Sequence, residues 1–253
     1  MSKMKTKELT EKIRDWLETQ GYPLEMKVAS ALRKVGFNVM QSQYYIDPET
    51  DVPREIDIIA YKNDVRGECE ISFLIECKVS KKKPWLLFSS EEALQRNIFF
   101  NFAVLSESAI NNLLNLNKEI THQIPWMRKR GRIAYGLTQA FTSGDDYPYK
   151  ASLNVLKAAV SKKLEFKKSK SFTPINVFFP VIIMDGEIFE CFLDDNAKVN
   201  IEKINEAFYL SDLTIANEFA TCIHIISAEK LEYFAEQAKN VADKLLSLFE
   251  KTK

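Results

Sequence analysis

The sequence predicts an α/β fold, a central mixed β-sheet flanked by helices, and three observations favour it. Segments with helical spacing of apolar residues alternate with short runs rich in β-branched and aromatic residues. Their order is two helices, three strands, a helical insertion, a helix, three strands and a closing helix, which is typical of layered α/β domains. With 253 residues, 46% of them hydrophobic, the chain can bury a sizeable core, and we expect a single domain over residues 1–253.

The N-terminal part predicts two helices and a three-stranded meander. The first helix, residues 5–20, is predicted by a stripe that consists of Leu9, Ile13, Trp16 and Leu17. Pro23 suits the first turn of a second helix, and Gly36 suits its C-cap. The buried face of this helix is expected to be Leu24, Val28, Ala31, Leu32 and Val35. The strands are expected at residues 37–46, 55–61 and 71–79.

The middle of the chain is read as an inserted helical segment over residues 84–147. Residues 91–116 contain long apolar stretches that look helical, and the basic segment WMRKRGR looks like a loop. An amphipathic helix is expected at 149–164. Asp185-Gly186 is a two-residue hairpin signal between strands expected at 175–184 and 187–193. A last strand at 221–227 and a helix at 228–249 close the chain.

The composition of the chain indicates in which compartment the protein resides and which residues could bind a metal. No apolar run approaches the roughly 18 residues of a membrane span, and the charged N-terminus has no signal-peptide core, so we expect a cytoplasmic protein. The four cysteines are scattered, without a CxxC pair, which favours reduced thiols. With only two histidines, His122 and His224, a Cys/His zinc site is not expected, and carboxylates would have to hold any metal.

The charge is neutral overall but unevenly distributed. Residues 126–170 contain eleven Lys/Arg against three Asp/Glu, a net of +8, and residues 185–253 contain seven Lys against fourteen Asp/Glu, a net of −7. A positive field on one face would suit nucleic acid, with Trp126, Tyr147 and Tyr149 as stacking partners, although a solvated surface explains the same residues.

Acidic and basic side chains interrupt two of the expected strands. Asp57 lies inside the run Ile-Asp-Ile-Ile-Ala, and Glu76 and Lys78 lie inside Leu-Ile-Glu-Cys-Lys-Val. The strand period of two puts Glu76 and Lys78 on one face, and hairpin pairing would bring Asp57 beside Glu76. Two adjacent carboxylates repel each other, and a divalent cation such as Mg²⁺ would relieve the repulsion. Lys78 could then orient or deprotonate a water, or stabilise a charged transition state.

This pattern, REID followed nineteen residues later by ECK, resembles the PD-(D/E)xK or restriction-endonuclease-like nucleases. The resemblance covers residues 22–79 and 149–227 and implies an αβββαβ core with the insertion outside it. It implies a catalytic set of Asp57, Glu76, Lys78 and, on the preceding helix, Glu25. Metal ligands would be Asp57, Glu76, the backbone carbonyl of Cys77 and Glu25, with Mg²⁺ as the cofactor and Mn²⁺ able to substitute. The implied activity is hydrolysis of phosphodiester bonds by an endonuclease, with DNA as the expected partner.

The sequence departs from this family at two points. Ile56 stands where the family often has proline before the acid, and a downstream glutamine or tyrosine motif is not clear, with Gln139 and Tyr149 as the nearest candidates. Glu25 also has another explanation, because a glutamate in the first turn of a helix is favourable through the helix dipole.

Other interpretations stay open at this stage. Asp57, Glu76 and Lys78 could form a structural ion-pair network, or the fold could serve as a catalytically silent module that binds nucleic acid or protein. The sequence has no P-loop, G-x-S-x-G or dinucleotide fingerprint to indicate a different enzyme class. DNA versus RNA is undecided, and specificity would come from the insertion, a partner or a homodimer.

Overall fold

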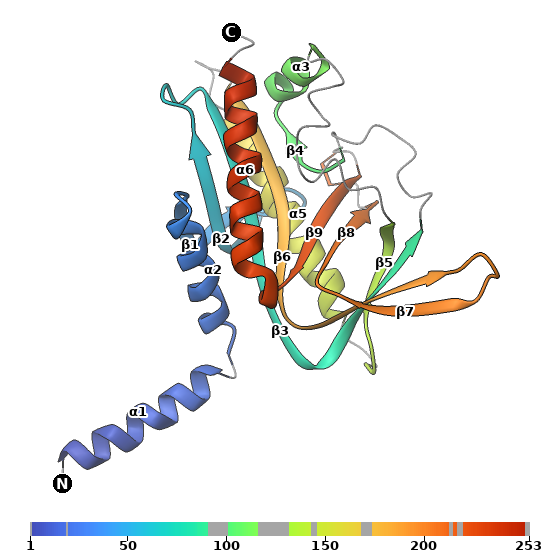
Figure 1. Cartoon of the computed structure of the whole chain (residues 1–253). Helices are drawn as coiled ribbons and strands as arrows, with labels where there is room; N and C mark the ends of the chain where they lie inside the picture. Colours follow the sequence, from blue (N-terminus) through green and yellow to red (C-terminus); the bar gives the residue numbers. More distant parts are fainter. Residues whose placement is uncertain are drawn as a thin grey trace.

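The computed structural model describes residues 2–18, 20–90, 101–115, 132–142, 146–167, 174–212, 215–216 and 220–250. These residues form an α/β structure in which a large mixed β-sheet is flanked by helices, as the sequence predicts (Figure 1). None of the helices in these ranges combines the length and apolar character required to cross a membrane.

The helices and strands follow the predicted order over most of the chain. The helices are α1 (Ser2–Glu18), α2 (Tyr22–Lys34), α3 (Glu107–Asn115), α5 (Tyr147–Lys167), the short η3 (Ala228–Lys230) and α6 (Leu231–Glu250). The strands are β1 (Asn38–Ile46), β2 (Pro53–Asn63), β3 (Cys69–Ser90), β4 (Val104–Leu105), β5 (Ile133–Gln139), β6 (Ile175–Leu193), β7 (Val199–Ile204), β8 (Glu206–Ser211) and β9 (Thr221–Ser227). Strands β4, β5, β7 and β8 are not among those that the sequence predicts.

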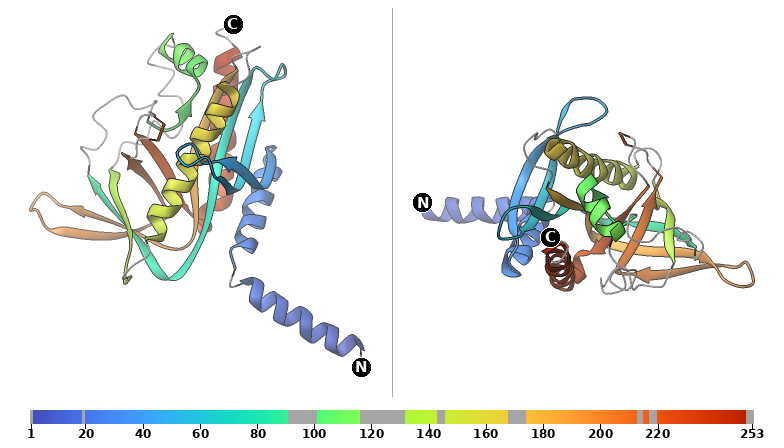
Figure 2. Two further views of the ribbon diagram at one scale, coloured as in Figure 1. Left: turned by 180° about the vertical axis from the view of Figure 1, so that it is seen from behind. Right: turned by 90° about the horizontal axis from the view of Figure 1, so that it is seen from above.

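The sheet combines an antiparallel meander with a strongly bent second part. Strands β1, β2 and β3 pair antiparallel in chain order, which confirms the predicted meander. Strand β3 also runs parallel to β6 from Cys69 opposite Ile175 to Phe88 opposite Cys191. Because β5 pairs with β3 and β8, and β9 pairs with β8 and β6, five strands form a closed circuit (Figure 2).

The predicted hairpin at Asp185-Gly186 is wrong, because β6 continues through both residues. Ser80 lies opposite Gly186 and Trp85 opposite Ile188, so residues 81–84 of β3 bulge where the two strands bend together. A Cβ atom on Gly186 would lie 2.5 Å from the Ser80 carbonyl oxygen. The glycine therefore serves the close approach of β6 to β3, and this long-range pairing overrides the local turn signal.

The expectation of a helical segment at 84–147 also needs correction. Residues 84–90 continue β3, and residues 133–139 form β5, so both belong to the sheet. Helix α3 and strand β4 lie between them, while residues 91–100 and 116–131 are outside the described ranges. The apolar runs in this stretch predict helices, but part of them forms paired strands, because a short apolar run is compatible with either structure.

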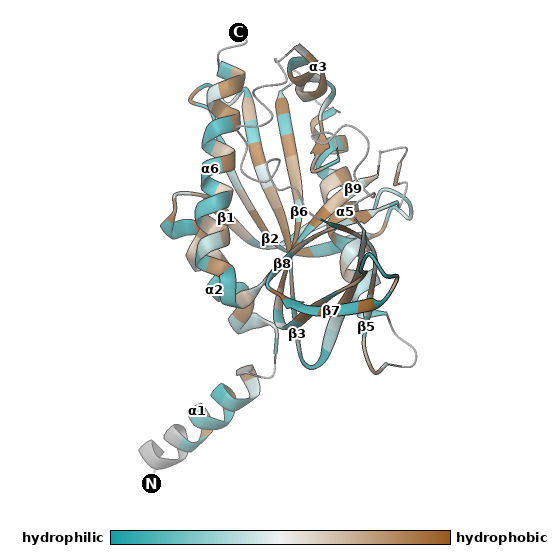
Figure 3. Ribbon diagram, turned by 45° about the vertical axis from the view of Figure 1, so that its right-hand side comes forward, coloured by the Kyte–Doolittle hydropathy of each residue, from teal (hydrophilic) through white to brown (hydrophobic). Residues whose placement is uncertain are grey.

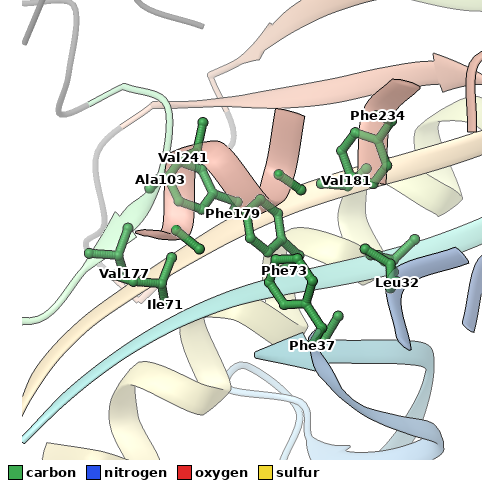
Figure 4. Packing of buried hydrophobic residues seen from close by; sticks show 14 of the residues in the cluster. Leu32, Phe37, Ile71, Phe73, Ala103, Val177, Phe179, Val181, Phe234 and Val241 are labelled. Carbon is green, nitrogen blue, oxygen red and sulfur yellow. The ribbon is translucent and has the colours of Figure 1, made fainter. Parts of the chain in front are cut away.

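The core consists of two hydrophobic clusters, one on each face of the sheet. The first lies between the sheet and helices α2 and α6, where Phe73 stacks on Phe179 with ring centroids 5.0 Å apart and Phe37 meets Phe73 edge-on (Figure 4). The second lies under α5 and includes Ile56, Leu74 and Val155. The brown, apolar strands in Figure 3 lie between these layers. The charged residues of the candidate site interrupt this apolar interior.

Candidate functional site

Asp57 and Cys77 mark the point where the ladder between β2 and β3 ends. The regular pairing of these strands runs as far as Ile58 opposite Ile75. At the next residue the Asp57 carboxylate replaces a main-chain partner, and its Oδ2 accepts a hydrogen bond from the Cys77 N–H at 2.6 Å. The structure thus brings Asp57 to the strand that carries Glu76 and Lys78, as predicted.

Glu76 is a buried carboxylate in which one oxygen is bonded to Lys78 and the other has no close hydrogen-bond partner among the described residues, although the Asn154 side chain approaches the carboxylate. Only 3% of the residue is exposed, and its Oε1 accepts a hydrogen bond from Lys78 Nζ at 2.6 Å. Its Oε2 is buried and has no hydrogen-bond partner among the described residues. A buried acceptor without a partner is costly and points to a group that is missing from the protein alone, such as a water or a cation.

The electrostatic environment raises the pKa of Glu76 to about 7. Burial is the main cause, and the negative charge of Asp57 adds to it, while the Lys78 ammonium and the nearby Asn154 amide act in the opposite direction. Burial likewise raises the pKa of Asp57, with Lys78 and the Cys77 N–H opposing it. The ionisation of each acid therefore depends on the charges around it, in particular on Lys78.

Lys78 is the cation of this group. Burial would lower its pKa, but the charges of Glu76 and Asp57 and the bond to Glu76 outweigh burial, so the pKa of Lys78 is raised. Lys78 is therefore held as an ammonium, with 31% of its side chain exposed. Of the roles considered for it, the charged form suits electrostatic stabilisation better than proton abstraction.

Glu25 approaches the same group from helix α2. It is half-buried in the first turn, and burial followed by the charges of Asp57 and Glu55 raises its pKa, with Lys78 opposing them. The helix dipole alone does not account for the pKa of Glu25, because the charges of Asp57 and Lys78 also act on it. All four predicted site residues are thus brought into one electrostatic cluster from α2, β2 and β3.

Two residues near Glu76 were missed at the sequence level. Asn154 on α5 lies close enough to Glu76 to lower its pKa. Tyr45 on β1 is buried, its hydroxyl donates a hydrogen bond to the Asn154 carbonyl at 3.2 Å, and burial and the Glu76 charge raise its pKa. Both residues are distant from Glu76 in the sequence, so no local spacing could have identified them.

A buried ion pair fixes α5 above the site, one helical turn beyond Asn154. Lys157 Nζ lies 2.9 Å from Asp47 Oδ2 and 2.8 Å from Glu49 Oε2, and Asp47 is completely buried. Burial alone would raise the pKa of Asp47, but the Lys157 ammonium and the N–H groups of Glu49 and Thr50 hold it far below its usual range. This anchor joins α5 to the β1–β2 turn.

The remaining predicted residues are less closely associated with the acids. Gln139 is buried on β5 and donates to Ser80 Oγ at 2.7 Å, two residues beyond Lys78. Tyr149 is exposed in the first turn of α5, and no hydrogen bond or ion pair within the described ranges joins it to Glu76. The lysines of the bulge, Lys81, Lys82 and Lys83, are exposed. Residues 126–131, 143–145 and 168–170 of the basic stretch, Trp126 among them, lie outside the described residues.

The arrangement partly fits a metal centre. In the described part of the chain, no group of three or more Asp, Glu, His or Cys side chains is placed to hold an ion. Mg²⁺ does not need such a group, because it retains several waters and often binds through one or two carboxylates and a substrate phosphate. Glu76 Oε2, Asp57 and the Cys77 carbonyl, which in an extended strand points to the same side as the Cys77 N–H, supply suitable oxygen donors.

Comparison of the chain with models of protein families, with characterised proteins and with solved structures found no match in any of the three.

Proposed function

We propose that this protein is a metal-dependent nuclease that hydrolyses phosphodiester bonds, with DNA as the preferred substrate and a restriction-endonuclease-like core. One observation carries the proposal: a buried, coupled group of Asp57, Glu76 and Lys78 in which Glu76 Oε2 lacks a partner. Burying two acids and leaving one oxygen unsatisfied destabilises a fold, so such a site favours a function over a structural role.

The chemistry of the donors suits a hard cation, Mg²⁺ or Mn²⁺. Glu76, Asp57 and the Cys77 carbonyl would hold it, with Glu25 as a further ligand through a water. When bound, such a metal activates water and neutralises charge on a phosphate. Glu76 must give up its proton to act as a ligand, and its elevated pKa makes this step sensitive to pH near neutrality.

Lys78 is proposed to stabilise the negative charge that develops on the scissile phosphate. Its ammonium now neutralises Glu76. A cation bound to Glu76 would compete for that carboxylate and leave the ammonium available to the substrate. The proximity of Asn154 and the anchor at Lys157 support a fixed orientation of Glu76 during this exchange.

The choice of nucleic acid as substrate is supported by the lysines beyond Lys78. Lys81, Lys82 and Lys83 are exposed on the β3 bulge, a few residues beyond Glu76 and Lys78 on the same strand. Ammonium groups at this position suit contacts with backbone phosphates, which carry no sequence information by themselves.

The direct test is cleavage of supercoiled plasmid, linear duplex, single-stranded DNA and RNA with Mg²⁺, with Mn²⁺ and with EDTA. The expected result is metal-dependent cleavage that Asp57→Asn and Glu76→Gln each reduce by about a hundredfold or more. Glu232→Gln, an exposed glutamate on α6, is the matched control and should cleave normally. Absence of cleavage on every substrate, or full activity of both site variants, would refute the proposal.

A catalytically silent module that binds nucleic acid or protein is the second candidate. It is favoured by the absence of a three-ligand group in the described ranges and by the closed Lys78–Glu76 pair. Titration with Mn²⁺ by calorimetry separates the two. A nuclease site should bind the ion and lose binding in Glu76→Gln, whereas a silent module should bind nucleic acid with an affinity that metal does not change.

A further inference from the structure

Asn176 is a buried polar residue of β6 whose side chain makes no hydrogen bond within the described part of the chain. The residue is 0% exposed, and neither its Oδ1 nor its Nδ2 has a partner there. Its side chain points to the α5 face of the sheet, because Phe178, two residues further along the strand, contacts Phe166 of α5. A buried amide whose donor and acceptor are both unused destabilises a fold, so it points to a polar ligand beside it.

A cavity of about 70 Å³ lies beside Asn176, between the C-terminal part of α5 and the start of α3. The two helices are joined at this place, since Lys167 Nζ lies 2.7 Å from Glu107 Oε1 (Figure 2). The cavity has room for a few waters, at ~30 Å³ each in the liquid, or for one small oxyanion. Its walls include Asn176, Ser106, Glu107, Ser108, Lys163, Phe166 and Lys167.

The N-terminus of α3 faces this cavity. The helix is nine residues long, and its first two residues, Glu107 and Ser108, are part of the cavity walls. Ser106 caps the helix, because its Oγ accepts the Ala109 N–H at 3.2 Å, and the same oxygen accepts the main-chain N–H of Asn176 at 3.0 Å. The start of the helix is thus fixed next to Asn176, where the helix dipole favours an anion.

The charged side chains of the cavity walls are two lysines and one glutamate. Lys163 and Lys167 come from α5 and Glu107 from α3. The hydrogen bond and the charge of Lys167, together with the charge of Lys163, lower the pKa of Glu107. Two positive charges and one negative charge leave a net charge of +1 at the walls, which adds to the positive end of the α3 dipole.

Two further carboxylates close to the cavity are engaged with other groups. Glu165 forms an ion pair with Lys162 at 2.8 Å. Glu70 lies opposite Asn176 on β3, and its Oε1 accepts a hydrogen bond from Ser72 Oγ at 2.6 Å. Burial raises the pKa of Glu70, against the opposing effects of Ser72 and Lys162, so its neutral form is favoured. Neither carboxylate therefore cancels the charge of the lysines in the walls.

We infer that this cavity binds a phosphate group, either free phosphate or the phosphate of a larger molecule. Lys163 and Lys167 supply positive charge, and Asn176 offers a donor to a P–O⁻ oxygen and an acceptor for a P–OH group. Sulfate lacks such a proton, so the amide favours phosphate over sulfate. The inference is independent of the nuclease proposal, because the cavity walls do not include the acids or the lysine of the candidate site.

Calorimetric titration of the full chain with inorganic phosphate tests the inference, at constant ionic strength and at about pH 6, close to the second pKa of a phosphate ester. The expected result is one phosphate per chain with a dissociation constant at or below about 1 mM, and sulfate binding at least about tenfold weaker. Glycerol 2-phosphate distinguishes the two sources of the group. Equal affinity for it assigns the cavity to the phosphate of a larger molecule, and binding of inorganic phosphate alone assigns it to the free ion.

Two variants identify the residues that bind the phosphate. Asn176→Leu should weaken binding at least about tenfold without lowering the urea midpoint of unfolding, because apolar atoms replace unpaired buried polar ones. A residue needed only for the fold would instead lower that midpoint. Lys163→Met removes one cation of the walls and should weaken binding about threefold or more. Lys12→Met, on the exposed face of α1, is the matched control and should bind phosphate normally.

Three results would overturn the inference. The first is the absence of saturable phosphate binding to the natural chain, and the second is equal affinity for sulfate and phosphate. The third is an unchanged affinity in Asn176→Leu. If that variant does not fold, as judged by circular dichroism, an unchanged affinity in Lys163→Met takes its place as the contradicting result.

Discussion

Asp57 Oδ2 accepts a hydrogen bond from the main-chain N–H of Cys77 at 2.6 Å, at the residue where the β2–β3 ladder ends. A side chain thus takes the place of a strand carbonyl, and the carboxylate is directed at the strand that carries Glu76 and Lys78. The same bond orients the Cys77 peptide toward Asp57. Asp57, Glu76 and Lys78 therefore meet inside an apolar sheet because the Asp57 side chain, and not a main-chain carbonyl of β2, accepts the Cys77 N–H.

The first prediction concerns the pH dependence of cleavage. Because the pKa of Glu76 is raised to about 7, its carboxylate form is scarce at pH 6 and dominant at pH 8. If ionised Glu76 is required, activity at subsaturating Mg²⁺ should fall about tenfold from pH 8 to pH 6. Since metal competes with the proton, a higher Mg²⁺ concentration should move the midpoint to lower pH. A midpoint that is unchanged over a wide range of Mg²⁺ would contradict this linkage.

The second prediction concerns stability. At pH values between the ordinary pKa of a glutamate and about 7, Glu76 keeps its proton in the native protein but has lost it in the unfolded chain. The free energy of unfolding therefore falls as the pH rises through this range. Glu76→Gln removes this effect. Its stability relative to the natural chain should therefore increase by about 3 kcal/mol from pH 5 to pH 8, measured by urea unfolding without metal. The exposed control Glu232→Gln should show no such trend. If Glu76→Gln changes the free energy of unfolding by the same amount at pH 5 and at pH 8, the pKa of Glu76 is not elevated.

The third prediction separates the roles of Lys78. A raised pKa keeps Lys78 charged at neutral pH, so a charge-stabilising role should tolerate another permanent cation better than a neutral side chain. Lys78→Arg should retain more activity than Lys78→Met, and the fall in activity that accompanies deprotonation of Lys78 at alkaline pH should move to higher pH in Lys78→Arg. Equal loss in both variants, together with loss of a rise in activity toward alkaline pH that the natural protein shows, would indicate proton abstraction by neutral Lys78 instead.

Periodicity and burial explain which parts of this site were predictable. Glu76 and Lys78 lie in an apolar run, and the period of two placed them together, as their hydrogen bond confirms. Antiparallel pairing brought Asp57 within reach. The pairing of β3 with β6 and the approach of Asn154 depend on contacts between distant segments, which local patterns do not encode. The turn at Asp185-Gly186 was wrong for the same reason.

The fourth prediction concerns the anchor under α5. Lys157→Met leaves the buried Asp47 carboxylate with Arg54 as its remaining cation, since Arg54 Nε lies 3.1 Å from Asp47 Oδ2 on a half-exposed side chain. The loss should therefore be about 1–3 kcal/mol, less than for a buried charge with no counter-ion. Asp47→Asn combined with Lys157→Met removes the carboxylate charge but preserves an acceptor for the turn N–H groups, so it should recover part of that loss. Lys12→Met, which breaks an exposed pair with Glu8, is the control and should be nearly neutral. Urea unfolding of the four proteins measures these differences, and a double variant no more stable than Lys157→Met would refute the charge-based account.

The last prediction tests the close approach of β3 and β6. A Cβ atom at Gly186 would lie 2.5 Å from the Ser80 carbonyl oxygen and 3.0 Å from its carbon, and neither main-chain atom can move without shifting β3. Gly186→Ala should therefore lower the free energy of unfolding by about 1–3 kcal/mol or more. The nearest atom to a Cβ at Gly21 is a flexible Glu25 oxygen at 3.5 Å, so Gly21→Ala should change stability little. If both variants unfold at the same urea concentration, the strands have room to separate, and Ser80, two residues beyond Lys78, is not held by this contact.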